Sequence, residues 1–310
     1  IFFFLHEFYT SCAMIKLIIY QSQKFKKETK QMDSKKKKEL ELWAAKIRKT
    51  ALQTIQTAGS GHIGGSFSIC DIMSVLYFDK MNVDPANPDK PDRDRLVLSK
   101  GHCSPAMYAT LALKGFFPVE HLSTFRKLDS DLSGHVEIHV PGVDMSAGSL
   151  GQGLSTALGM AMYAKANKTG NRVFCIMGDG EIQEGQVWEA AMCAGFYKAD
   201  NLIAFVDNNN LQLDGSLEEV MSPYPIGDKF KAFGWNVIEI DGHDVEQIAD
   251  AVELASVVTG KPTAIVAHTI KGKGVSLFEN NVDFHGGQPK PEQWPACFAE
   301  LDARLAELED

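Results

Sequence analysis

The chain has 310 residues, of which 45% are hydrophobic and 23% are charged, as in an ordinary globular protein with a full core. Its formal net charge of −9 argues against a nucleic-acid partner, which would require a basic face. No stretch has the length and clean apolar character of a transmembrane helix. We therefore expect a cytoplasmic protein in which any anionic substrate is held by a local site.

The six cysteines are scattered and include no Cys-x-x-Cys pair. This usage is typical of reduced thiols in the cytoplasm, and it predicts neither a disulfide framework nor a zinc site. They are Cys12, Cys70, Cys103, Cys175, Cys193 and Cys297.

Residues 1–31 differ in character from the rest of the chain. They are aromatic and apolar, but they lack a basic start and a clear small-residue cleavage site, so they make a poor signal peptide. We predict that they are a non-native or disordered extension and that Met32 is the natural start. An amphipathic interaction arm is the alternative. The lysine run at residues 35–38 predicts a solvated helix start.

A helical pattern over residues 38–58 ends at Gly59, and the glycine-rich segment GSGHIGGS follows it. Glycines allow a backbone to approach a ligand closely, so this loop can present His62 to a site. A flexible loop with an incidental histidine is the alternative. A further helix is predicted over residues 68–78.

Two more histidines stand in loops of the next segment. His102 lies in KGHCSP, between a predicted strand at residues 95–99 and a helix at 106–114, where a helix N-terminus helps to hold a polar group. His135 lies in SGH, upstream of the segment PGVDMSAGSLGQG. That segment opens a helix of small residues over 154–165, which predicts close packing in the core or at an interface.

The central stretch predicts a βαβ unit. Residues 173–177 and 202–206 are apolar runs of β type, and residues 184–197 carry apolar side chains at helical spacing. The motifs GDG and NNN follow the two strands, so Asp179 and Asn209, 30 residues apart, are expected in one crevice at the carboxyl ends of neighbouring parallel strands. Their oxygens suit a divalent cation and leave room for phosphate. GDG alone also suits a simple turn, and the asparagines at the matching strand end favour a site.

The alternation of strands and helices continues to the end of the chain. Strands are predicted at residues 235–240 and 262–268, with a helix at 245–258 between them and a loop at 271–275 after them. The tail, residues 291–310, predicts an amphipathic helix. We therefore expect a doubly wound, mainly parallel α/β sheet flanked by helices.

The domain boundaries follow from the absence of any repeat, low-complexity linker or break in composition after residue 32. We expect one α/β domain over residues 32–290 and a C-terminal helical tail over 291–310.

Four histidines each lie in a Gly-containing loop of this predicted domain, which suggests that they form one polar cluster at the crevice. A zinc site is the competing explanation, and the long spacings without nearby carboxylates or thiolates speak against it. The four are His62, His102, His135 and His285.

Taken in order, the motifs resemble those of transketolases. They are SGHIGG, SKGHCSPAMYA, GHVEIHVPGVDMSAGSLGQG, GDGEIQEGQVWEA, DNNNLQLDG and FHGG, and they span about residues 36–290. GDG followed after about 27 residues by NN resembles the diphosphate-anchoring pattern of thiamine diphosphate enzymes. Ile63, Lys100 and Ser149 replace a proline, an asparagine and a proline of the single-chain form, as in transketolases split into two polypeptides.

The resemblance implies a thiamine diphosphate site with Mg²⁺ or Ca²⁺. Asp179, the side chain of Asn209 and the backbone carbonyl of Leu211 would bind the metal. The four histidines would surround the reactive carbon of the cofactor, bind the substrate's carbonyl and hydroxyls, and move protons. The residues implied to line the cofactor are His102, Gly148, Leu150, Asp179, Gly180, Asn209 and His285.

Glu184 has two interpretations. It is a favourable charge in the first turn of the helix predicted to begin near residue 183. In the family this glutamate lies at a subunit interface near its counterpart, which implies that it also couples paired sites.

We expect no second α/β domain in the remaining segments of this sequence. The resemblance therefore implies a partner C-terminal transketolase subunit in an α₂β₂ assembly, which supplies the activating glutamate and the arginines for sugar phosphates. Together they would transfer a two-carbon ketol unit from a ketose phosphate to an aldose phosphate, in the pentose phosphate pathway. The alternatives are the alpha subunit of a 2-oxo acid dehydrogenase, a 1-deoxyxylulose-5-phosphate synthase, and an inactive binding paralogue.

Overall fold

The structure is a computed structural model that describes residues 32–310, so the predicted extension at residues 1–31 lies outside the described residues. Its sheet has five strands, all parallel, in the order β1-β2-β3-β5-β4. The strands are β1 (Arg95–Leu98), β2 (Val173–Gly178), β3 (Leu202–Asn208), β4 (Asn236–Asp241) and β5 (Thr263–His268). The predicted parallel α/β sheet is therefore confirmed.

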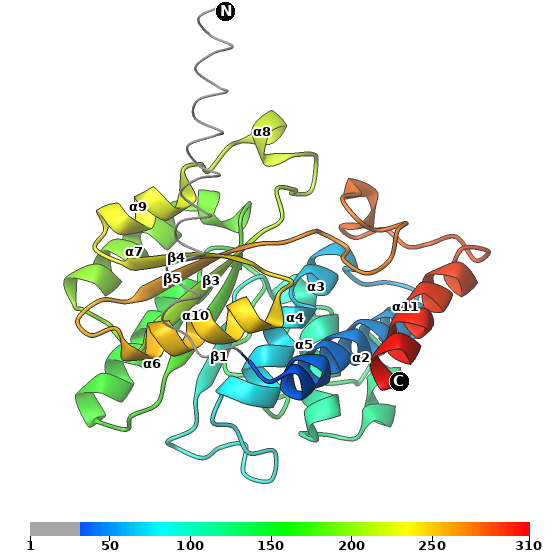
Figure 1. Ribbon diagram of the computed structural model, residues 1–310, viewed down its shortest axis with the longest axis horizontal. Helices are drawn as coiled ribbons and strands as arrows, with labels where there is room; N and C mark the ends of the chain where they lie inside the picture. The colour runs from blue at the N-terminus through cyan, green and yellow to red at the C-terminus, as the bar shows by residue number, and fades with distance from the viewer. Residues whose placement is uncertain (1–31) are drawn as a thin grey trace, which may run out of the picture.

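Helices cover both faces of this sheet (Figure 1). They are α2 (Ser34–Ala58), α3 (Gly64–Ser68), α4 (Cys70–Val75), α5 (Ser104–Lys114), α6 (Gly153–Asn167), α7 (Gly185–Phe196), α8 (Leu217–Val220), α9 (Ile226–Ala232), α10 (Val245–Val257) and α11 (Trp294–Glu309). The predicted single helix at residues 68–78 differs from the structure, in which α3 begins at Gly64, α4 follows it, and a π-helix at Leu76–Lys80 follows α4.

The two faces of the sheet follow from the alternation of side chains along each strand. On β2, Phe174 and Ile176 pack in the core with α2, α4, α5 and α10, whereas Val173 and Cys175 pack with α6, α7 and α9 on the other face. Crossovers between parallel strands are right-handed. Helices α6 and α7, which directly precede β2 and β3, therefore lie on the same face of the sheet. The chain runs in the reverse direction across the sheet from β4 to β5, so α10 between them lies on the opposite face.

The predicted terminal helix is α11, which lies along α2 (Figure 1). Its residues Cys297, Leu301 and Leu308 are buried, so this helix covers part of the core. No membrane-spanning segment can be assigned to the helices of residues 32–310, since none combines the required length with enough apolar character.

Strands β2 and β3 run in parallel register, with Val173 opposite Leu202 and Gly178 opposite Asp207. Helix α7 connects them, which confirms the predicted βαβ unit. The carboxyl ends of these strands therefore open at the same edge of the sheet, where the GDG and NNN motifs begin.

Candidate cofactor and active site

The four loop histidines lie together, as the sequence predicted. The ring centroid of His62 is 5.0 Å from that of His102, 6.0 Å from that of His135 and 5.4 Å from that of His285. Tertiary structure brings these rings together from loops more than 200 residues apart in the chain. The Nδ1 atom of His62 is buried and has no hydrogen-bond partner among residues 32–310.

All four histidines are neutral near pH 7, because burial lowers each pKa. The pKa of His62 falls to about 4, with Arg126 as the next cause after burial. The pKa of His285 falls to about 3, with Lys271 as the next cause. A neutral imidazole has one nitrogen that donates a hydrogen bond and one that accepts, so the cluster suits hydrogen bonding to carbonyl and hydroxyl groups.

Lys271 lies beside this cluster, in the loop that follows β5. Its Nζ donates to the Nδ1 of His285 at 3.0 Å and to the backbone carbonyl of Leu211 at 3.2 Å. An ammonium group cannot accept a hydrogen bond, so His285 carries its proton on Nε2. Burial lowers the pKa of Lys271 to about 8. Nothing in the sequence distinguished Lys271 from an ordinary loop lysine.

Asp179 stands directly after β2 and is 1% exposed. Its carboxylate accepts hydrogen bonds from the backbone of Gly180 at 2.8 Å, the side chain of Asn208 at 3.1 Å and the backbone of Asn210 at 2.6 Å. Burial, followed by the charge of Asp207, raises the pKa of Asp179 to about 6. No basic side chain of the described part of the chain forms an ion pair with it.

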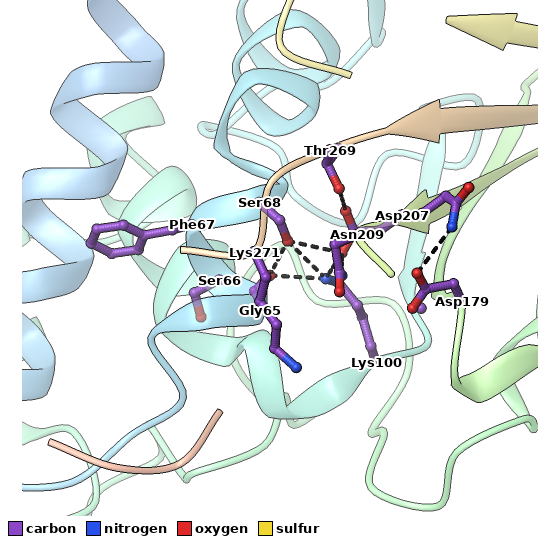
Figure 2. Close-up of polar contacts among 12 residues, drawn as sticks. Gly65, Ser66, Phe67, Ser68, Lys100, Asp179, Asp207, Asn209, Thr269 and Lys271 are labelled. Atoms are coloured by element: carbon purple, nitrogen blue, oxygen red, sulfur yellow. Dashed lines mark hydrogen bonds and ion pairs between the residues drawn. The ribbon is translucent and has the colours of Figure 1, made fainter. Parts of the chain in front are cut away.

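Asn209 lies directly after β3, which pairs with the strand that leads to Asp179, but its side chain does not bond to Asp179 (Figure 2). Its Nδ2 donates to Asp207 at 2.8 Å, and its Oδ1 accepts from the backbone of Leu211 at 3.2 Å. The direct partners of Asp179 are Asn208 and Asn210 instead. The two predicted metal ligands therefore share one strand edge without a direct hydrogen bond.

A buried ion pair between Asp207 and Lys100 supports this edge. Their Oδ2 and Nζ atoms are 2.5 Å apart, and their residues are 0% and 2% exposed. Ser68 and Thr269 also donate to the Asp207 carboxylate, at 2.8 and 2.5 Å, and Lys100 donates to the Gly65 carbonyl at 2.8 Å (Figure 2).

Opposing effects set the charge states of this pair. Burial alone would raise the pKa of Asp207, but Lys100 and the hydrogen bonds outweigh it and hold that pKa below its ordinary value. The same pairing keeps the pKa of Lys100 raised despite its burial. The sequence showed Lys100 only as a departure from the single-chain motif. Its role depends on a contact with Asp207, 107 residues away.

The GSLGQG loop is attached to the same edge by Glu181. The buried Glu181 carboxylate accepts hydrogen bonds from the backbone of Gly151 and Gly178, both at 2.9 Å, and from the Ser99 hydroxyl. Gly148 and Leu150 are exposed on this loop. The predicted cofactor-lining residues of the loop are thus available to a ligand, and Glu181 fixes the backbone that carries them.

Glu184 is the exposed N-cap residue of α7, and its side chain makes no capping hydrogen bond. The helix begins at Gly185, two residues later than the sequence predicted, so Glu184 precedes the first turn. Gly151 packs against it with a φ of +86°, and an added Cβ there would lie 2.6 Å from the Cβ of Glu184. This contact places Glu184 beside the GSLGQG loop.

The residues present fit a divalent cation and a diphosphate. Asp179 is a buried carboxylate whose pKa is raised by burial and by the charge of Asp207, and it forms no ion pair with a basic side chain of residues 32–310, so a divalent cation would supply the missing positive charge. The Leu211 carbonyl accepts a hydrogen bond from the ammonium of Lys271, so a positive charge already lies beside this oxygen. Residues 32–310 contain no group of three or more His, Cys, Asp or Glu side chains arranged around a metal. A cation here would therefore depend on one carboxylate with amide and backbone oxygens, which suit Mg²⁺ or Ca²⁺.

Comparisons with known proteins agree with this site. The family described as "Transketolase, thiamine diphosphate binding domain" matches residues 40–295. The chain is 49% identical over 257 residues to the 6-deoxy-6-sulfo-D-fructose transketolase subunit SqwG of Clostridium sp. (strain MSTE9), covering 83% of this chain and 94% of that protein. It is 44% identical over 270 residues to an apulose-4-phosphate transketolase subunit of Phocaeicola vulgatus, covering 87% of this chain and 96% of that protein.

Longer transketolases also match, over less than half of their own length. The transketolase structure from Campylobacter jejuni superposes with a TM-score of 0.78 at 34% identity, covering 87% of this chain and 46% of that chain. The chain thus spans less than half of such single-chain enzymes, whereas it covers nearly all of the two subunits named above. The resemblance inferred from the motifs is confirmed, and the chain belongs to the transketolase family as its thiamine diphosphate binding domain.

Proposed function

We propose that this chain is the N-terminal subunit of a two-subunit transketolase. With a partner C-terminal subunit it transfers a two-carbon ketol unit from a ketose phosphate to an aldose phosphate. The observation that carries the proposal is the cluster of four neutral histidines beside Lys271 and the Asp179 strand edge. The two relatives named as subunits, matched over nearly their full length, support the split form.

Asp179, the Asn209 side chain and the Leu211 carbonyl would hold Mg²⁺ or Ca²⁺ against the cofactor diphosphate. Gly148, Leu150, Gly180, His102 and His285 would line the cofactor. When bound, thiamine diphosphate supplies the stabilisation of a carbanion, which no side chain provides. Lys271 adds a positive charge on the same side, next to the Leu211 carbonyl.

The histidines perform the polar part of the reaction. His285 carries its proton on Nε2 because Lys271 donates to its Nδ1, so it presents a donor to a substrate oxygen. His62, His102 and His135 are neutral and half-buried, and they can bind the carbonyl and hydroxyl groups of the sugar and exchange protons with them. Burial lowers the pKa of all four rings, which favours their neutral form near pH 7.

The proposed subunit contacts rest on exposed apolar side chains and on Glu184. Helices α6 and α7, with the C-cap residue of α7, leave five large side chains exposed, which are Met162, Tyr163, Met192, Phe196 and Tyr197. Such exposure is typical of a protein interface. We propose that this face, with Glu184 at its edge, lies between subunits and couples paired sites in an assembly with two copies of each chain.

The substrates are sugars that carry an anionic group. The two relatives act, by their names, on 6-deoxy-6-sulfo-D-fructose and on apulose 4-phosphate, so a terminal sulfonate is a second option beside the phosphate. We propose a place in cytoplasmic carbohydrate metabolism, with the pentose phosphate pathway as the first expectation and the metabolism of less common sugars as the alternative.

Coexpression with a candidate C-terminal subunit tests this function. The complex should transfer a ketol unit between sugar phosphates only when both chains, Mg²⁺ and thiamine diphosphate are present. Asp179→Ala should abolish cofactor binding, and Asp228→Ala, an exposed position on α9, is the matched control. Decarboxylation of a 2-oxo acid, or condensation to a 1-deoxyketose, would assign the chain to another thiamine diphosphate enzyme. Cofactor binding unchanged by Asp179→Ala would refute the proposed site, and a chain that no partner makes active would support the inactive paralogue.

A further inference from the structure

His243 lies in the turn between β4 and α10, and both nitrogens of its ring are hydrogen-bonded. Its Nδ1 lies 2.7 Å from the Oδ2 of Asp71 on α4, and its Nε2 accepts a hydrogen bond from the backbone N–H of Ile270 at 2.8 Å. Its side chain is 13% exposed. The ring therefore connects a helix near the start of the described chain to the loop that follows β5.

These two bonds fix the position of the ring proton. A backbone N–H can only donate, so the Nε2 that faces Ile270 carries no proton, and the Nδ1 donates to the Asp71 carboxylate. His285 has the opposite tautomer, because Lys271 donates to its Nδ1. A proton on the Nε2 of His243 would remove the acceptor of the Ile270 N–H, so this arrangement requires a neutral ring.

A buried ion pair holds the other end of this connection. Arg48 and Asp71 are 7% and 6% exposed, and the Nη1 of Arg48 donates to the Asp71 Oδ1 at 3.2 Å. Burial alone would raise the pKa of Asp71, but Arg48 and the bond from His243 outweigh it and lower that pKa to about 2. The Asp71 carboxylate is therefore charged, balanced by Arg48, and a fixed acceptor for His243.

The Ile270 N–H belongs to the residue directly before Lys271. On the other side of Lys271, the backbone N–H of Gly272 donates to the Gly64 carbonyl at 3.0 Å. The side chain of Lys271 lies against this segment, since an added Cβ at Gly64 would be 2.9 Å from its Cγ. Lys271 is thus held between two backbone bonds, one to His243 and one to the segment that follows His62.

We propose that His243 is a positioning residue of the cofactor site, which holds Lys271 through the Ile270 N–H and so keeps the Lys271 ammonium on the Nδ1 of His285. The inference rests on the proposed function and deepens it. Within residues 32–310, His243 forms no hydrogen bond with a residue proposed to bind the metal or to line the cofactor, so its effect on the site passes through the loop after β5.

Two amide variants separate this role from a contribution to stability. The amide group of Asn ends near the Nδ1 position of a histidine ring, and that of Gln reaches the Nε2 position. His243→Asn therefore keeps a donor for Asp71 and loses the acceptor of the Ile270 N–H, whereas His243→Gln keeps that acceptor and loses the bond to Asp71. A positioning role makes His243→Asn the more harmful change for the site, and a purely structural role makes it His243→Gln.

Calorimetry on the two-subunit complex measures the effect on the site. His243→Asn should weaken thiamine diphosphate binding about 3- to 10-fold, the effect of one lost hydrogen bond, and His243→Gln should stay within about twofold of the wild type. Added to Lys271→Met, His243→Asn should change the affinity by less than about twofold, since the group that it positions is then absent. His268→Asn, at an exposed histidine that ends β5, is the matched control.

Urea unfolding of the same variants gives the opposite order. His243→Gln should be the less stable variant, because it loses the hydrogen bond to the charged Asp71 carboxylate. Affinities that follow the order of stability, or a loss in the double variant equal to the sum of the single losses, would overturn the proposal.

Nitrogen NMR of the full chain, isotopically labelled on histidine, tests the geometry without the cofactor. The wild type should show His243 protonated on Nδ1 and His285 protonated on Nε2. His243→Asn should move the His285 Nδ1 resonance toward its position in Lys271→Met, and His243→Gln should leave it in place. Protonation of His243 on Nε2, or a His285 resonance unchanged by His243→Asn, would refute the positioning role. A wild-type complex without ketol transfer would refute the proposed function, and these resonances would still report on His243.

Discussion

Replacing Asp179 with Asn should stabilise the cofactor-free chain near pH 7 and remove its response to Mg²⁺ and thiamine diphosphate. Burial and the nearby Asp207 raise the pKa of Asp179 from 3.8 to about 6. Because the native state then holds this proton more tightly than the unfolded chain, ionisation costs stability as the pH rises from 4 to 6. A shift of two pKa units corresponds to about 3 kcal/mol.

The amide of the variant offsets part of this gain. Its oxygen can keep the hydrogen bonds from Asn208 and Asn210, but its nitrogen would face the backbone N–H of Gly180, which costs about 1 kcal/mol. The net stabilisation is about 2 kcal/mol, or roughly 4–8 °C in Tm for a chain of this size. Stability and cation binding therefore oppose each other at this position.

Thermal unfolding followed by circular dichroism at pH 5 and 7 measures this effect. Without ligands, the difference in Tm between Asp179→Asn and the wild type should be larger at pH 7 than at pH 5. With Mg²⁺ and thiamine diphosphate, the wild type should gain stability and the variant should not. Asp228→Asn on α9 should behave as the wild type in every condition. A variant that is destabilised at pH 7, or that keeps the full ligand shift, would refute the reasoning.

Three other substitutions probe the supporting contacts. Asp207→Asn leaves Lys100 buried without a counter-charge, so urea unfolding should show a loss of about 3–5 kcal/mol, and adding Lys100→Met should recover part of it. Equal stability of the single and double variants would contradict that pairing. Gly151→Ala should lower the Tm and the cofactor affinity more than Gly170→Ala. Both glycines have a left-handed φ, but only an alanine at position 151 would place its Cβ 2.6 Å from the Cβ of Glu184, at the N-cap of α7. Equal effects would mean that backbone strain alone decides the outcome. Calorimetry should show the affinity of the wild type for thiamine diphosphate falling above about pH 8, where Lys271 loses its charge, and Lys271→Met should bind more weakly without that dependence. If the affinity of Lys271→Met fell by the same amount above that pH, Lys271 would not be the source of the pH dependence.

Much of the fold could be predicted because its signals are local. The apolar run of β2, the helical spacing of α7 and the apolar run of β3 each belong to one short segment. Parallel strands joined by a right-handed crossover then bring the ends of β2 and β3 together, so the positions of Asp179 and Asn209 follow from topology. The histidine cluster was predictable from local signals too, since each histidine stands in a Gly-containing loop.

Contacts between distant segments could not be predicted in this way. The pairing of Lys100 with Asp207, the bond from Lys271 to His285 and the position of Arg126 beside Ser60 depend on how side chains from separate loops pack. A lysine or arginine in a loop has no local pattern that distinguishes a buried ion pair from a solvated charge.

The sequence by itself thus determined the parallel α/β fold, the strand ends that carry the GDG and NNN motifs, and the set of four histidines. Only the tertiary structure decided that Asn209 bonds to Asp207 while Asn208 and Asn210 hold Asp179. The physical reason is that secondary structure depends on the periodicity of neighbouring residues, whereas charge states and hydrogen-bond partners depend on burial and on contacts across the whole chain.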